Sequence, residues 1–394
     1  MKANSLKTRY VARNEVDSLT QLIRLYMPKL PSLVIKGLGY RMAGSLYTPK
    51  PARLGLKVTN RCNARCIMCP GWRMDDDGKE LTVGEIREVI SNPLFDSLER
   101  FSFGGGEPTI REDLAEIAEV VLDARPGIKR FGISTNGLQP SRVRQQVMSL
   151  ADITHKRSVE FSVAVSIDGY RDTHDRIRRV PHAFDKVNET ILLLKELRMQ
   201  LPFNMHLNTV VQQLNISELP QLYEFARELE LKIQFIPAIA ALLAENDDDR
   251  QKLELNPLQI EEMKLFLNNP QHTMLPVWAA FWQEYFRVIQ GGRRRFPCAL
   301  LYHSVHLHSD GNLFICGVHE PMILGNIHDA PADEIWYSDE AKRIRERVKE
   351  NYCPNCVNSC DIPFSLGEEF FYFARFLMKE EFKKLLRRFQ QVHL

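Results

Sequence analysis

The chain has 394 residues, of which 44% are hydrophobic and 26% charged, and its formal net charge is +2. This composition is typical of a globular protein with room for a large core and an appended module. The near-balance of charge excludes a chain-wide attraction to nucleic acid. We find no apolar signal segment at the N-terminus and no apolar run that could span a membrane, so we expect a cytoplasmic protein.

Residues 1–50 have an amphipathic helical pattern that stops at a proline-containing linker. From 51 to 240, short apolar segments alternate with helical patterns. Such an alternation predicts parallel strands joined by right-handed crossovers. Six such units are too few to close an eight-stranded barrel, so we predict an α/β fold, a partial (β/α)6 TIM-like barrel. Its six predicted strands span 54–60, 98–106, 129–137, 159–169, 203–212 and 232–238.

The alternation stops after residue 240. We predict a helical bridge over 241–297, a short and turn-rich module over 298–365, and a C-terminal amphipathic helix over 366–394. The helical segments at the two ends could make a peripheral contact with a membrane surface or a partner. Packing against the barrel is the simpler interpretation.

The eight cysteines form two groups. Cys62, Cys66 and Cys69 follow the first predicted strand in a C-x3-C-x2-C pattern. In a long chain without an export signal, grouped thiols indicate metal binding rather than disulfides. Three thiolates can bind three irons of a [4Fe–4S] cluster and leave the fourth iron open. The alternative is a zinc site completed by a histidine, although the next histidine along the chain is His155.

The segment CNARCIMC resembles the cysteine signature of the radical S-adenosylmethionine (radical SAM) enzymes, in its usual place after the first strand. Further strand ends are similar to motifs of that family and occur in its order: FGGGEP at 103–108, STNG at 134–137, and SIDG at 166–169 followed by HDRIRR at 174–179. The resemblance covers residues 54–238. One departure is Met68, where the family often has an aromatic residue.

The resemblance implies that SAM chelates the open iron. Reduction then cleaves SAM to methionine and a 5′-deoxyadenosyl radical, which takes a hydrogen atom from the substrate. Gly105 and Gly106 would let the backbone approach the amino group of SAM. Glu107 would receive that ammonium or be structural, and Arg178 would clamp the carboxylate. Three further side chains would contact the ribose or the carboxylate: Ser166, Asp168 and Asn208.

The downstream cysteines, with Gly311 in a Gly-x4-Cys pattern, resemble the SPASM/twitch modules that hold auxiliary iron–sulfur clusters. Five thiols suffice for one four-cysteine cluster, implied to be [4Fe–4S], but not for two. A structural zinc site built from the same thiols is the alternative. The implied ligands are Cys298, Cys316, Cys353 and one or both of Cys356 and Cys360.

The resemblance therefore implies an enzyme, an oxidoreductase or a modifying enzyme, that draws electrons from a reductant such as flavodoxin or ferredoxin. The sequence indicates no catalytic acid or base. We expect the substrate to be a small molecule that is oxidised or rearranged. A peptide or protein substrate is the second interpretation. A non-catalytic, metal-stabilised binding protein on the same fold is the third.

Overall fold

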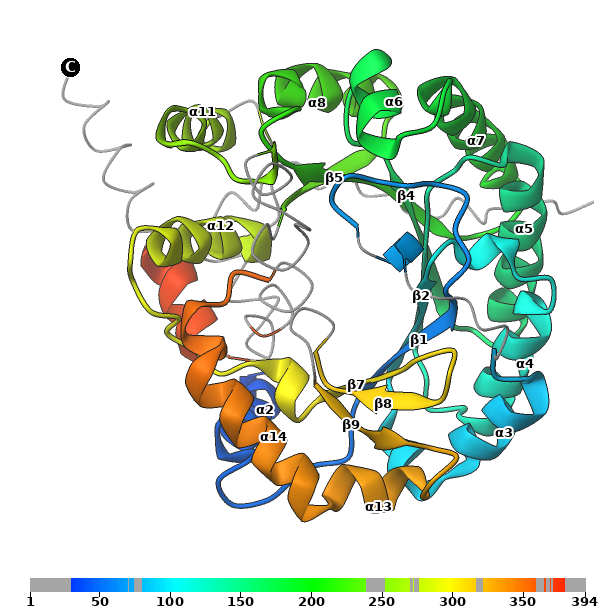
Figure 1. Ribbon diagram of the computed structural model, residues 1–394, viewed down its shortest axis with the longest axis vertical. Helices are drawn as coiled ribbons and strands as arrows, with labels where there is room; N and C mark the ends of the chain where they lie inside the picture. Colours follow the sequence, from blue (N-terminus) through cyan, green and yellow to red (C-terminus); the bar gives the residue numbers. More distant parts are fainter. Residues whose placement is uncertain are drawn as a thin grey trace, which may run out of the picture.

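The structure is a computed structural model that describes residues 30–69, 71–73, 80–238, 252–269, 272, 276–316, 322–358, 365, 369 and 371–379. A single sheet curves around the centre of the molecule, and helices cover its outer side (Figure 1). Its strand order is β6-β5-β4-β3-β2-β1-β7-β8-β9. The six parallel strands of the barrel are β1 (Arg53–Thr59), β2 (Arg100–Gly105), β3 (Arg130–Thr135), β4 (Glu160–Ser166), β5 (Asn204–Val211) and β6 (Lys232–Pro237).

The first five of these strands are each followed by helix, as the sequence predicts. In α5, for example, Val143, Val147, Leu150 and Ala151 recur every three or four residues and are buried, so one stripe of the helix packs on the sheet. The crossover helices are α3 (Val83–Ser91), α4 (Leu114–Ala124), α5 (Pro140–Lys156), α6 (Asp172–Arg178), α7 (Ala183–Leu197) and α8 (Leu219–Glu228).

A ladder of phenylalanines fixes the register of the central strands on the side that faces the helices. Phe101, Phe131 and Phe161 are paired across β2, β3 and β4. Their rings stack with centroids 5.3 and 5.2 Å apart. Each ring is at most 2% exposed, and burial of such a side chain contributes about 1.5–3 kcal/mol. A shift of one residue would turn all three away from the helices, so the strand ends stay aligned.

The downstream cysteine module continues the sheet of the barrel. Strand β7 (Ser304–Leu307) pairs in parallel with β1, and β8 (Asn312–Phe314) and β9 (Ile323–Asn326) follow in antiparallel order. No local pattern in the sequence predicts the pairing of β7 with β1. Over the described residues, β6 and β9 remain at opposite edges. The sheet is therefore open, which confirms the predicted partial barrel.

The remaining helices complete the ring in Figure 1. The carboxylate of Glu284 is buried and accepts hydrogen bonds from Arg287 at 2.7 Å and Tyr372 at 2.6 Å, and it also pairs with Arg295. This network joins the predicted bridge to the helical segment at 371–379. No described helix is both long and apolar enough to cross a membrane. The remaining helices are α2 (Leu30–Met42), α11 (Pro257–Leu267), α12 (Pro276–Ile289), α13 (Ala332–Tyr337) and α14 (Asp339–Asn351).

Candidate functional site

The three upstream thiols lie on the loop that follows β1, at the edge where the parallel strands end. Cys66 is buried, Cys62 is partly buried and Cys69 is exposed. The loop is fastened to α6, because the Ile67 amide donates to the Ile177 carbonyl at 3.0 Å. The departure at Met68 is accommodated in the core, where this side chain is 6% exposed. The three thiols on this loop therefore differ in their exposure to solvent.

The two glycines at the end of β2 allow that strand to lie directly against the start of the cysteine loop. The amide of Gly106 donates to the Thr59 carbonyl at 2.8 Å. A Cβ atom on Gly106 would stand 2.1 Å from the Arg61 carbonyl oxygen. Gly105 has a φ of +114°, and its Cβ would stand 2.2 Å from the Thr59 oxygen. The two glycines are therefore needed for the close packing of β2 against the start of the cysteine loop.

Gly105→Ala is expected to lower the free energy of unfolding by about 2 kcal/mol, because the new methyl group overlaps a carbonyl in a strained backbone conformation. Gly104→Ala is the matched control, since nothing lies within 4 Å of its Cβ position. Urea unfolding followed by circular dichroism measures both variants. Equal stability of the two variants would show that the close approach at Gly105 is not needed.

Glu107 ties the end of β2 to the end of β3. Its buried carboxylate accepts from the hydroxyls of Thr109 at 2.6 Å and Thr135 at 2.8 Å, and from the Asn136 amide at 2.6 Å. Burial raises the pKa of Glu107, and these donors oppose the rise. Of the two roles expected from the sequence, the structural one accounts for all of these contacts.

Asn136, in the STNG segment, contacts the cysteine loop directly, although nothing in the sequence singles it out. Its Nδ2 donates to the Cys62 Sγ at 3.8 Å and to the Asn63 Oδ1 at 2.7 Å. Hydrogen bonds to the sulfurs of a cluster influence its reduction potential. The position of the motif at a strand end is the available signal, because the ends of neighbouring parallel strands meet at one edge.

A buried ion pair connects β4 to the cysteine loop. Arg178 Nη2 lies 2.6 Å from Asp168 Oδ2, and its Nη1 lies 3.6 Å from the Cys66 Sγ. The Val210 amide holds the other carboxylate oxygen of Asp168 at 2.7 Å. Burial raises the pKa of Asp168. Burial also disfavours the charged form of Arg178, but the neighbouring Asp168 carboxylate raises the pKa of Arg178. The structure thus places Arg178 against the loop and Asp168 behind it.

Ser166, at the end of β4, is paired with Asn208 of β5. The Oδ1 atom of Asn208 is buried and has no hydrogen-bond partner among the described residues. A buried acceptor without a partner costs free energy, and a hydroxyl of a bound ligand would satisfy it. The predicted residues of β1, β2, β4 and β5 therefore gather at one edge of the barrel.

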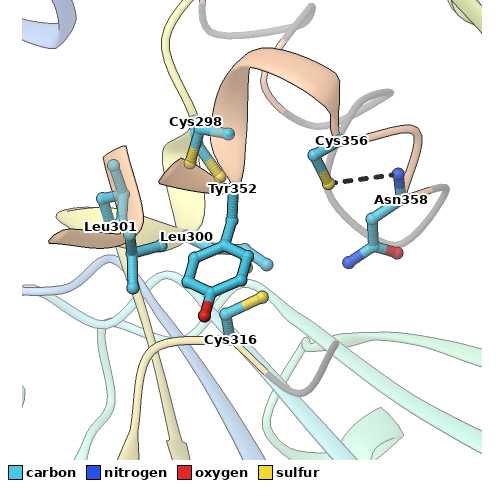
Figure 2. Close-up of a pocket in the computed structure, with 9 residues that line it drawn as sticks. Cys298, Leu300, Leu301, Cys316, Tyr352, Cys356 and Asn358 are labelled. Atoms are coloured by element: carbon cyan, nitrogen blue, oxygen red, sulfur yellow. Dashed lines mark hydrogen bonds between the residues drawn. The ribbon is translucent and has the colours of Figure 1, made fainter. Parts of the chain in front are cut away.

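Four downstream thiols line a pocket that is separate from the cysteine loop of the barrel. Cys298 precedes a short turn at Ala299–Leu301, and Cys316 follows β8 (Figure 2). Cys353 and Cys356 follow α14, and the Asn358 amide donates to the Cys356 Sγ at 3.4 Å. Cys360 lies outside the described residues. The walls of the pocket also include Leu300, Leu301, Val348 and Tyr352.

The arrangement of the thiols bears on what they could hold. Within the described ranges, no three His, Cys, Asp or Glu side chains converge as a single metal ion would require. In a [4Fe–4S] cluster each cysteine binds a different iron, so its thiols surround a cavity. Four thiols around one largely apolar pocket therefore fit a cluster better than a zinc ion.

Two family models match the chain. Residues 56–226 match the radical SAM superfamily, and residues 298–361 match SPASM, an iron–sulfur cluster-binding domain. An AdoMet-dependent heme synthase of Methanosarcina barkeri is 26% identical over 317 residues, which cover 75% of this chain and 85% of that protein. AdoMet is another name for SAM. Several further curated relatives are longer than the matched region, and the chain covers between 29 and 58% of their length.

Two solved structures share the fold. A polyhistidine-tagged anSMEcpe with bound AdoMet has a TM-score of 0.55 at 19% identity, over 83% of this chain and 98% of that chain. Streptococcus suis SuiB bound to its precursor peptide SuiA also has a TM-score of 0.55, at 14% identity, over 86% of this chain and 75% of that chain.

These findings confirm the predicted family, the partial barrel and the cofactors. The cofactors are a [4Fe–4S] cluster with SAM and an auxiliary iron–sulfur cluster. The two family matches coincide with the two groups of cysteines, one at the edge of the barrel and one around the separate pocket. The chain is an enzyme that belongs to the radical SAM superfamily and carries a C-terminal SPASM domain.

Proposed function

We propose that Cys62, Cys66 and Cys69 hold the [4Fe–4S] cluster that binds SAM, and that the auxiliary cluster occupies the downstream pocket. When bound, SAM and its cluster supply a 5′-deoxyadenosyl radical that abstracts a hydrogen atom. The division of the thiols supports this proposal. Three stand on one loop without a fourth, which leaves an iron for SAM, whereas four surround the other pocket: Cys298, Cys316, Cys353 and Cys356.

The side chains at the barrel edge have distinct proposed roles toward SAM. Arg178 binds the carboxylate, for which a guanidinium is well shaped, and Asp168 holds Arg178 in place. Asn208 accepts a hydrogen bond from a ribose hydroxyl, and Ser166 beside it contacts the same sugar. The backbone around Gly105 and Gly106 lies next to the amino group of SAM. Glu107 holds this backbone in place through its hydrogen bond with the Asn136 amide.

Cys356→Ala is expected to remove the auxiliary cluster and lower the iron content from about eight to about four per chain. Cys360→Ala is expected to leave about eight, because Cys356 already completes four thiols around the pocket. Iron analysis after anaerobic reconstitution measures both variants. The reverse result would assign Cys360 as the fourth ligand, and loss in both would make each of them necessary.

We propose a small molecule as the substrate and flavodoxin or ferredoxin as the electron donor. The support for a small molecule as the substrate is the AdoMet-dependent heme synthase, of whose length the chain covers 85%. Cells grown on deuterated medium provide a labelled extract for the test. The reconstituted enzyme, SAM and dithionite should then yield deuterated 5′-deoxyadenosine from a protease-treated, low-mass fraction of that extract.

The second candidate is a peptide substrate. One observation favours it, namely that SuiB, which shares the fold, was solved bound to its precursor peptide. At 14% identity this likeness concerns the fold alone. In the same experiment, deuterium transfer that disappears after protease treatment would replace the small molecule by a peptide. No transfer from any fraction would contradict both.

A further inference from the structure

A buried arginine, Arg345 on α14, stands behind the wall of the auxiliary pocket and is 1% exposed. Its Nε donates to the Leu301 carbonyl at 2.9 Å and its Nη1 to the Trp336 carbonyl at 3.0 Å. The guanidinium also lies over the Trp336 ring, 4.2 Å from its centroid. Within the described part of the chain, Nη2 has no hydrogen-bond partner and no carboxylate pairs with this side chain.

Such a group is costly to bury. A guanidinium remains charged near neutral pH, and an unpaired charge in the interior loses the solvation that water provides. Burial lowers the pKa of Arg345 to about 10, so the side chain still carries its charge at pH 7. Two carbonyl acceptors and a ring face stabilise the charge but do not neutralise it. No carboxylate of the described residues forms an ion pair with this positive charge, although Glu346 lines a neighbouring pocket together with Arg345.

Leu301 and Val348 connect this charge with the pocket of the four thiols. Leu301 contacts both the charge and the pocket, since its carbonyl accepts a hydrogen bond from Arg345 and the residue also lines the pocket. Val348, one helical turn after Arg345, lines the pocket as well. The ring of Tyr302 lies 5.8 Å from the guanidinium.

We propose that Arg345 raises the reduction potential of the auxiliary cluster through its charge. This inference rests on the proposed function, in which the four thiols hold that cluster. Reduction adds one electron to a cluster that its thiolates already make anionic, so a fixed positive charge nearby favours the reduced form. Leu300, Leu301 and Val348 make the intervening wall apolar, which weakens screening. Arg345 acts here as a positioning residue and contacts no reacting atom.

The test is a potentiometric titration of the full-length chain with dithionite, followed by electron paramagnetic resonance. The substitutions Cys62→Ala, Cys66→Ala and Cys69→Ala in the same chain leave the auxiliary signal alone. Arg345→Gln is expected to lower the equilibrium constant for reduction about tenfold, which for one electron is about 59 mV. Arg345→Lys keeps a charge only while the buried ammonium is protonated, so its potential should approach that of the parent as the pH is lowered. The matched control is Arg343→Gln on the same helix, because Arg343 is 68% exposed and pairs with Glu340 at 2.6 Å.

The outcomes separate this inference from the proposal beneath it. If the parent chain binds no iron in the auxiliary pocket, the proposed ligation fails. If the cluster loads fully and Arg345→Gln leaves its potential unchanged, only the role of Arg345 is overturned. The same holds if Arg345→Lys stays as low as Arg345→Gln at every pH measured. Should the glutamine variant not fold, Arg345→Lys alone still decides, because a potential that does not rise toward that of the parent as the ammonium is protonated contradicts a role for the charge.

Discussion

Cys66→Ala is expected to abolish the formation of 5′-deoxyadenosine from SAM, down to the background of the reductant alone. Cys66 is the most deeply buried of the three loop thiols and the one that Arg178 contacts. Without it, only two thiols remain to hold a cluster, and no described histidine or carboxylate converges to replace it. Liquid chromatography of anaerobic reactions measures the product.

The auxiliary cluster provides the internal control for this variant. Iron should fall from about eight to about four per chain, since the downstream pocket shares no residue with the loop. A variant that retains about four irons is folded, so its loss of SAM cleavage is then specific to the loop. Continued cleavage by Cys66→Ala at the parental rate would contradict the assignment of this thiol.

Arg178→Met is expected to lower the free energy of unfolding by about 3–5 kcal/mol and to weaken SAM binding. The substitution leaves Asp168 buried without its partner, and breaking one side of a buried ion pair has a cost of this size. It also removes the proposed ligand of the SAM carboxylate. Urea unfolding and the KM for SAM measure the two effects separately.

A double variant shows whether the ion pair is the cause. Arg178→Met combined with Asp168→Asn should be less destabilised than Arg178→Met alone, because no uncompensated charge then stays buried. Arg176→Met on the same helix is the surface control, since Arg176 is exposed. Additive losses in the double variant would show that the two side chains act independently.

The sequence is informative wherever local pattern determines structure. The six barrel strands and their helices follow from the spacing of apolar residues and from turns. The gathering of the cysteine loop with Glu107, Ser166 and Asn208 also follows, because parallel strands end at one edge. Each of these features depends on residues that are near in sequence or that share a strand end.

Pairing between distant segments is what the sequence leaves open. Strand β7 joins β1 across about 250 residues, and no local signal selects that edge. Likewise, the resemblance implies that Asp168 contacts the ribose or the carboxylate of SAM, but no local pattern predicts that its carboxylate pairs with Arg178 and accepts a hydrogen bond from the Val210 amide. The contact of Asn136 with Cys62 escapes prediction for the same reason, since it joins two loops in space.

The central claim is that one group of thiols leaves an iron open for SAM while the other closes a separate cluster. Anaerobic reconstitution of the full chain, with iron and zinc analysis and an assay of SAM cleavage under dithionite, tests it most directly. The account predicts about eight irons per chain and the formation of 5′-deoxyadenosine. Zinc in place of iron, or a reduced protein that leaves SAM intact, would contradict it.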